Sequence, residues 1–202
     1  MFKSIKKDSF YYGAPVILMT TLDIENDIEN DIANITPISS SWTLGNSVVI
    51  GLGKTSKGLQ NIKSTKEFTL NLVSDRLWDK VEAIAKTTGN KIVEGWKKDM
   101  GYSYCEDKFS LGGFTRERGE TVKVPRIIEC PIQIEVSAKS ILERDEYYIV
   151  EGEIKNILVD DSILTVEEYI IVEKWKPLIY KFRSYTTTKD SLGKNFRFDE
   201  KI

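Results

Sequence analysis

The sequence contains no histidine. This absence excludes Ser-His-Asp and Cys-His catalysis, H-E-x-x-H zinc sites and an imidazole proton shuttle. Its two cysteines, Cys105 and Cys130, stand far apart and form no C-x-x-C pair, so we interpret both as buried, inert thiols and expect no metal site. If the protein is an enzyme, we therefore expect a cofactor to supply the chemistry.

An excess of charge and a long hydrophobic run are missing as well. The 29 basic and 31 acidic side chains nearly cancel, which disfavours nucleic acid and an anionic membrane surface as partners. The apolar run from Val16 to Met19 is too short for a signal sequence or a membrane span, so we expect a cytoplasmic protein. With 41% hydrophobic residues, the 202-residue chain can bury a core without disulfides, and we predict a single domain over residues 1–202.

Short segments rich in β-branched and aromatic residues predict a mainly β fold with a sheet that closes on itself. The predicted strands are Ala14–Thr21, Ser47–Gly53, Glu67–Val73, Ile127–Val136, Tyr147–Ile157 and Leu178–Tyr185. Between residues 75 and 100 the spacing of apolar residues becomes helical, first at Leu77, Val81, Ile84 and Ala85, then at Ile92, Val93 and Trp96. This region predicts a helical insert between strands.

The segment Ile24–Asn34 carries isoleucines at every fourth position between acidic and amide residues. It lacks the alternating oxygen ligands, the central glycine and the terminal glutamate of an EF-hand loop. We interpret it as a hairpin extension or a single helical turn between two strands.

The stretch Gly51–Asn61, G-L-G-K-T-S-K-G-L-Q-N, contains a GKT triplet after a predicted strand. It is not a Walker A loop, because Val48 stands where that loop needs its first glycine, and Ser56 stands where a dinucleotide fingerprint needs its third. A helix over Gly58–Lys63, capped by Thr55 or Ser56, would still direct N–H groups, hydroxyls and two ammonium groups at one phosphate. The alternative is an ordinary helix cap beside two solvated lysines.

The stretch Asn34–Trp42, N-I-T-P-I-S-S-S-W, has four hydroxyl residues around Pro37 and predicts an irregular loop in place of a continuing strand. The Asn34 amide can exchange hydrogen bonds with the edge of a heterocycle, and Trp42 offers a rigid apolar face. The alternative is a tight turn with a core tryptophan. Because one strand joins this cluster to the lysine cluster, we expect both at the same end of the sheet.

Together these segments resemble the flavin reductase-like FMN-binding split-barrel family, particularly its flavoredoxin-like members. The resemblance also rests on Tyr11–Thr21, Phe68–Leu72, Val124–Glu135 and Val150–Ile154, and so covers most of the chain. It implies a Greek-key split β-barrel with a helical insert, and a homodimer with FMN near the subunit interface. It further implies that Asn34, Ile35 and Thr36 meet the ring and ribityl chain, that Ser39, Ser40, Ser41 and Trp42 line the ribityl and phosphate, and that Lys54, Thr55, Ser56, Lys57 and Asn61 close on the phosphate. A phosphate favours such donors and disfavours a nearby carboxylate.

One departure from the family concerns a histidine that many NADH-using members carry just before a late strand. This chain has Asp145, Glu146, Tyr147 and Tyr148 there, which places direct use of NAD(P)H in doubt. We therefore expect an FMN-binding oxidoreductase that receives electrons from NAD(P)H or a protein donor. The alternatives are a non-catalytic flavin carrier or electron-transfer module, and a barrel for another phosphorylated heterocycle, as in relatives of pyridoxamine phosphate oxidase. In a dimer, we expect Trp78, Phe196 and Phe198 to bury against the two-fold mate.

Overall fold

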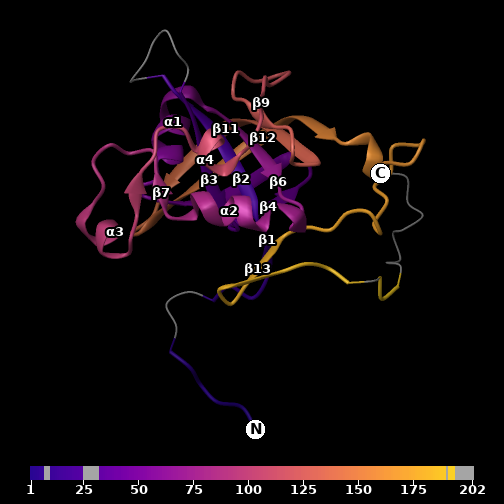
Figure 1. Ribbon diagram of the computed structural model, residues 1–202, viewed down its shortest axis with the longest axis horizontal. Helices are drawn as coiled ribbons and strands as arrows, with labels where there is room; N and C mark the ends of the chain where they lie inside the picture. Colours follow the sequence, from indigo (N-terminus) through magenta and orange to yellow (C-terminus); the bar gives the residue numbers. More distant parts are fainter. Residues whose placement is uncertain (7–9, 25–31, 190, 194–202) are drawn as a thin grey trace.

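The computed structural model describes residues 1–6, 10–24, 32–189 and 191–193, and it consists mainly of antiparallel strands with short helices (Figure 1). The main sheet has seven strands, in the order β3 (Ile32–Ile38), β2 (Ile17–Asp23), β6 (Glu67–Leu72), β11 (Ile132–Glu143), β12 (Tyr147–Val159), β5 (Ser47–Gly53) and β4 (Ser41–Leu44). Short strands pair outside it: β1 (Ala14–Pro15) with β13 (Ile179–Lys181) and β14 (Ser184–Thr186), β7 (Thr87–Thr88) with β8 (Ser103–Tyr104), and β9 (Arg116–Glu117) with β10 (Arg126–Ile127). The helices are α1 (Lys57–Thr65), α2 (Trp78–Ala85), α3 (Gly95–Asp99) and α4 (Lys108–Gly112), with 3-10 turns at Asp75–Leu77 and Asp161–Ile163.

The main sheet must curl, because its two end strands are neighbours in sequence. Strands β3 and β4 stand at opposite ends of the strand order, yet only Ser39 and Ser40 separate them. Two residues span only a short distance, so the end of β3 and the start of β4 must lie close together. The two edges of the sheet therefore approach one another. At this link the Gly51 N–H donates to the Ser40 carbonyl at 2.9 Å. The result is a barrel that is open between β3 and β4.

Strand β2 lies between two hydrophobic cores, and all of its residues are buried. Ile17 and Met19 pack into one core with α1, while Leu18 and Leu22 pack into a second core with α2 and α4. This division follows from the alternation of side chains along a strand. Because both faces are covered, the polar residues of β2, Thr20, Thr21 and Asp23, are buried along with its apolar ones.

A buried carboxylate stabilises the loop that precedes β10. Glu135 of β11 is fully buried and accepts hydrogen bonds from the Glu120 N–H at 2.7 Å and the Thr121 N–H at 2.8 Å. The Thr121 hydroxyl also donates to it, and Arg126 Nε lies 3.9 Å away. The carboxylate therefore replaces its lost hydration with charge-assisted hydrogen bonds.

Three of the six predicted strands are confirmed, and three are divided. The predicted strand Ala14–Thr21 is interrupted at Val16 and forms β1 and most of β2, which belong to different sheets. Segment Ser47–Gly53 is β5, and Glu67–Val73 and Tyr147–Ile157 correspond to β6 and β12. The prediction of one strand over Ile127–Val136 was wrong at its start, because the chain turns after Ile127 and β11 begins only past Pro131. Segment Leu178–Tyr185 contains the hairpin of β13 and β14, whose turn residues Phe182 and Arg183 both have positive φ, as in a type I′ turn.

The predicted irregular loop at Asn34–Trp42 was wrong. The segment forms the end strands β3 and β4, and only Ser39 and Ser40 lie between them. Pro37 is tolerated because β3 is an edge strand: proline lacks an N–H group, but one side of an edge strand needs no ladder donor.

The helical insert is present but shorter than predicted. Val81 and Ile84 of α2 are buried as expected, whereas Ile92 and Val93 precede α3, and Ile92 is exposed. In Figure 1, α3 lies on an excursion of the chain at the left edge, away from the main sheet. Helix α1 confirms the helix predicted over Gly58–Lys63.

The structure tests the remaining predictions only in part. Cys130 is buried, but Cys105 is partly exposed. The repeat at Ile24–Asn34 falls mostly outside the described residues, as do Phe196 and Phe198. No helix in the described ranges is long and apolar enough to cross a membrane.

We predict that Glu135→Ala lowers the free energy of unfolding by about 3 kcal/mol, because two backbone donors and the Thr121 hydroxyl lose a buried acceptor. Chemical denaturation of the purified variant measures this loss. Glu129→Ala is the matched control, since Glu129 also accepts from a threonine N–H and hydroxyl but is less buried. Equal losses in the two variants would contradict the role assigned to burial.

Candidate functional site

A polar face of β3 forms one wall of the candidate site. Ala33 and Ile35 point into the core, so Asn34 and Thr36 face the opposite way. Asn34 is only 4% exposed, and its Nδ2 donates to Thr36 Oγ1 at 3.0 Å. Its Oδ1 is buried and has no hydrogen-bond partner within the described residues. A buried amide oxygen without a donor is costly, which is typical of a position that a ligand completes.

Helix α1 begins beside this face and approaches it closely. Gly58 allows the approach, because a Cβ there would lie 2.5 Å from Met19 Cε and 2.9 Å from Thr36 Oγ1. Ser56 occupies the N-cap position predicted for it, but its hydroxyl makes no capping hydrogen bond. Ser56 Oγ is buried and, like Asn34 Oδ1, lacks a partner among the described residues. The N-terminal N–H groups of α1 and one unused hydroxyl are thus available to an acceptor.

The lysine at the start of α1 is not solvated. Lys57 Nζ lies 2.7 Å from Asp23 Oδ2, and the two side chains are only 10% and 7% exposed. This corrects the expectation of a site without carboxylates and of a solvent-accessible lysine. Asp23 reaches Lys57 because it ends β2, the strand that pairs with β3 and packs against α1.

The excursion that contains β7, β8 and α3 covers the site from the other side. Gly89 stands against β3, since a Cβ there would lie 2.7 Å from Asn34 Oδ1 and 2.9 Å from Lys57 Cγ. Asn90 Nδ2 and Lys97 Nζ donate to the Thr55 carbonyl at 3.0 and 3.2 Å. These bonds fasten the excursion to the turn before α1.

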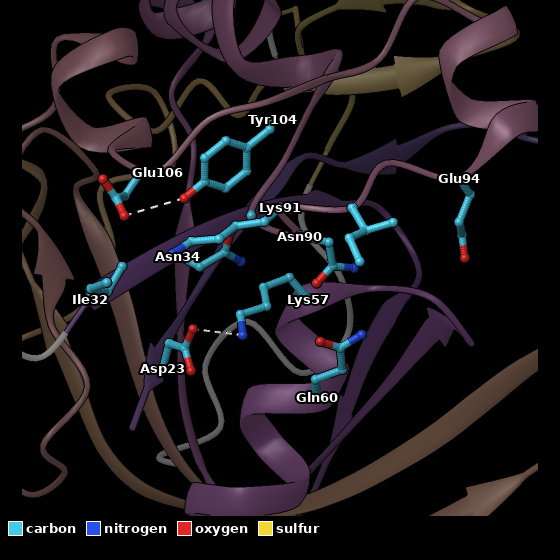
Figure 2. A pocket seen from close by; sticks show the side chains of 12 residues that line it. Asp23, Ile32, Asn34, Lys57, Gln60, Asn90, Lys91, Glu94, Tyr104 and Glu106 are labelled. Carbon is cyan, nitrogen blue, oxygen red and sulfur yellow. Dashed lines mark hydrogen bonds and ion pairs between the residues drawn. The ribbon is translucent and has the colours of Figure 1, made fainter. Parts of the chain in front are cut away.

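Between these walls lies a hollow of about 410 Å³, which we call the Asn34 hollow. Its lining residues are Asp23, Ile32, Asn34, Lys57, Gln60, Gly89, Asn90, Lys91, Ile92, Glu94, Tyr104 and Glu106. Figure 2 shows the Asn34 and Lys57 side chains next to each other, with Tyr104 and Gln60 on either side. The Tyr104 hydroxyl donates to Glu106 at 3.2 Å, and partial burial and then this carboxylate raise the pKa of Tyr104. The hollow is polar and carries charges of both signs.

The serine cluster lines a different hollow of about 950 Å³, which we call the Trp42 hollow. It includes Ser39, Ser40, Ser41 and Trp42, and it shares no lining residue with the Asn34 hollow. Ser40 Oγ donates to the Gly51 carbonyl at 2.7 Å. Trp42 is 57% exposed, so it is not a core residue in this chain. Asn34 and Lys57, one from each predicted cluster, line the Asn34 hollow together, whereas Ser39, Ser40, Ser41 and Trp42 line the Trp42 hollow.

Comparison with known proteins identifies the family. The model of the flavin reductase like domain matches residues 9–189. The chain belongs to this family. The uncharacterized protein YdfE of Bacillus subtilis (strain 168) is 38% identical over 199 residues, which cover 97% of this chain and 94% of YdfE.

Solved structures of low identity share the fold of this flavin reductase-like chain. Flavoredoxin of Desulfovibrio vulgaris (Miyazaki F) has a TM-score of 0.80 at 24% identity, covering 97% of this chain and 98% of that one. A putative flavin reductase with a split barrel domain from Shewanella frigidimarina NCIMB 400 has a TM-score of 0.68 at 17% identity, covering 91% and 86%. The predicted family and the split-barrel fold are confirmed, and the chain is a flavin-related protein of the oxidoreductase type.

Three other predicted site residues of the flavin reductase-like chain, Lys54, Ile35 and Asn61, line neither hollow. Lys54 pairs with Glu143 at 3.0 Å in an exposed position. The Ile35 side chain is fully buried in the core, so only its backbone is available to a ligand. Asn61 is also buried, and its Nδ2 donates to Thr21 Oγ1 at 3.0 Å.

Sequence reasoning missed Asp23, Gly89, Asn90, Tyr104 and Lys108. Lys108, the first residue of α4, is 3% exposed and donates to the Ile35 carbonyl at 2.8 Å. Burial lowers the pKa of Lys108 to about 8. Only Gly89-Asn90 carries a local signal, since this dipeptide is typical of a turn. The other three, Asp23, Tyr104 and Lys108, reach the site through tertiary contacts.

The buried pair at the start of α1 leads to a prediction about the two lysines of the GKT segment. Lys57→Met removes the buried ammonium group that lies 2.7 Å from Asp23 Oδ2 and should lower the free energy of unfolding by roughly 3 kcal/mol. Lys54→Met removes an exposed pair and should leave it nearly unchanged. Urea denaturation of both apo-proteins compares them, and a Lys57→Met variant as stable as wild type would mean that the pair contributes no stability.

Proposed function

We propose that this protein is an FMN-dependent oxidoreductase that binds the cofactor at the Asn34 hollow. Within a flavin reductase-like chain, the supporting observation is the pair of unused buried polar atoms, Asn34 Oδ1 and Ser56 Oγ. Asn34 Oδ1 lies on the β3 wall of the hollow, and Ser56 Oγ lies at the start of α1. Glycine at positions 58 and 89 lets α1 and the Gly89 turn pack closely against this wall.

The donors and acceptors of this region match the chemistry of FMN. Asn34 Oδ1 is an acceptor, and the imide N–H of an isoalloxazine ring is a donor. Thr36 and the backbone of Ile35 lie next to Asn34 on β3 and would contact the ribityl chain. Ser56, the first N–H groups of α1 and Lys57 would hold the phosphate, since a helix N-terminus favours an anion.

The bound flavin would supply the electron transfer, and the chain's own residues would bind and orient it. Asp23 has a defined part in this arrangement, because it holds the Lys57 ammonium at 2.7 Å and limits how far Lys57 can turn toward a ligand. Lys57 would therefore contribute as one half of a fixed ion pair, with less net positive charge than a free lysine. We assign the discrimination for phosphate mainly to Ser56 and the α1 N–H groups.

Ser39, Ser40, Ser41 and Trp42 would not contact a flavin confined to the Asn34 hollow, because they line the other one. The Trp42 hollow includes Tyr12, Trp42 and Leu44, which are 77%, 57% and 75% exposed. Exposed apolar side chains around one concave surface are typical of an interaction site. We assign this surface to the two-fold mate of a homodimer.

The electron donor is NAD(P)H or a reduced protein. The lack of histidine favours the second candidate function, a flavin carrier or electron-transfer module that does not oxidise NAD(P)H. Steady-state oxidation of NADH and NADPH with excess FMN distinguishes the two. Saturable turnover would reject the carrier, and flavin binding without turnover would reject the reductase.

The cofactor assignment predicts that the purified protein is yellow or takes up added FMN, with Ser56 as a selective contact. Ser56→Ala should leave the stability of the apo-protein unchanged, because the hydroxyl has no partner to lose within the described residues. It should weaken FMN at least tenfold, since a hydrogen bond to a charged group contributes roughly 1.5–3 kcal/mol. Riboflavin, which lacks the phosphate, should bind as before.

Fluorescence titration with both flavins measures these affinities. Ser64→Ala is the matched control on α1, one residue before the last of the helix and far from the phosphate contacts. A colourless protein that binds neither flavin would defeat the proposed function. Equal weakening of FMN and riboflavin in Ser56→Ala would place the hydroxyl near the ring instead of the phosphate.

The assembly proposal predicts a particle of twice the chain mass in light scattering. Trp42→Glu should shift it toward monomer, because a buried charge opposes burial of the Trp42 hollow. Trp96→Glu, a change of another exposed tryptophan outside that hollow, is the control. A wild-type protein that stays monomeric at all concentrations would contradict the dimer.

A further inference from the structure

Lys108 is a buried ammonium group held by backbone carbonyls. Its Nζ donates to the Ile35 carbonyl at 2.8 Å and to the Thr87 carbonyl at 3.4 Å. No carboxylate in the described part of the chain lies within ion-pair distance of it. The titratable groups that face it are Cys105 and Lys97. Burying a cation without an anion is costly, so its presence needs a reason beyond packing.

The first carbonyl belongs to the wall of the Asn34 hollow. Strand β3 is an end strand that pairs with β2 alone, so its other edge presents unpaired backbone groups. Lys108 binds the edge carbonyl of Ile35, which lies between Asn34 and Thr36. It thereby fixes the backbone that orients both polar side chains.

The second carbonyl belongs to the opposite wall. Thr87 begins β7, shortly before the turn in which Gly89 stands against Asn34 Oδ1. A single ammonium group therefore joins the two walls of the hollow from behind. A neutral donor could satisfy both carbonyls at a lower desolvation cost. Hydrogen bonding alone therefore does not explain why this donor is charged.

We infer that Lys108 is a positioning residue of the flavin site, which holds β3 and the Gly89 turn together and places a positive charge behind them that favours reduced over oxidised flavin. This inference rests on the proposed function. Reduction by two electrons with uptake of one proton leaves the flavin ring one charge more negative than its oxidised form, so a nearby buried cation stabilises the reduced flavin preferentially. The effect is a property of the binding equilibrium and needs no particular electron donor.

Two variants separate position from charge. Lys108→Met removes the bonds and the charge, and should weaken both FMN and riboflavin at least fivefold. Lys108→Gln keeps a donor without the charge, and should recover part of that affinity for the oxidised flavin. In both variants the midpoint potential, titrated with dithionite, should fall, so that the ratio of affinities for reduced and oxidised FMN decreases at least threefold.

Lys80→Met is the matched control, because Lys80 also donates to a backbone carbonyl, that of Gly113, but in an exposed position next to α4. It should change neither affinity nor potential. A purely structural role for Lys108 would lower affinity in Lys108→Met and leave the potential of Lys108→Gln at the wild-type value, which would overturn the inference.

The pH dependence of the wild-type potential tests the charge without any variant. Burial lowers the pKa of Lys108 to about 8, so the ammonium is present below that pH and is lost above it. The difference in potential between wild type and Lys108→Gln should therefore be largest below about pH 8 and should shrink above it. Burial raises the pKa of the Cys105 thiol, which stays neutral over the lower range, and a pH-independent difference would contradict the assignment.

The failures of the two hypotheses are distinguishable. A wild-type protein that binds neither FMN nor riboflavin overturns the proposed function, and this inference with it. Wild-type binding with unchanged affinity and potential in both Lys108 variants overturns the inference alone.

Discussion

The two-residue link between β3 and β4 constrains the whole molecule, because these strands are the two ends of a seven-stranded sheet. The sheet can satisfy this link only by curling until its edges meet. Curling encloses one core with α1 inside the barrel, and leaves the outer face of β2 and β3 for a second core under α2 and α4. Of the two end strands, β3 contributes Asn34 to one hollow and β4 contributes Trp42 to the other.

An opening in a barrel exposes the backbone of an edge strand, and this chain covers that edge with polar groups from other elements. Lys108 binds the edge carbonyl of β3, and the Gly89 turn lies against Asn34. Lys57 and Asp23 form a buried pair next to them. These groups cost desolvation energy that an apolar wall would avoid, and such costs are typical of functional sites.

The two hollows differ in character, and this difference suggests different occupants. The Asn34 hollow carries charges of both signs and unused polar atoms beside it, which suits a polar cofactor. Among the residues of the Trp42 hollow, Glu151 is the single charged one, and several are apolar and exposed, which suits a protein surface. The family resemblance in the sequence predicted a single pocket for the residues of both hollows. It could not separate them, because Ser39–Trp42 of one hollow lie between Asn34 and Lys57 of the other along the chain.

The sequence by itself determined the features that depend on neighbouring residues. The lack of histidine directed the chemistry toward a cofactor, the strand Ser47–Gly53 and the helix at Lys57 followed from local patterns, and the order of motifs identified the family. Only the tertiary structure brought Asp23 to Lys57, Gly89 to Asn34 and Lys108 to Ile35. It also decided that Pro37 lies in an edge strand. Residues far apart in sequence meet through strand pairing and packing, whose register depends on the whole sheet, so no local pattern records which charges will be buried together.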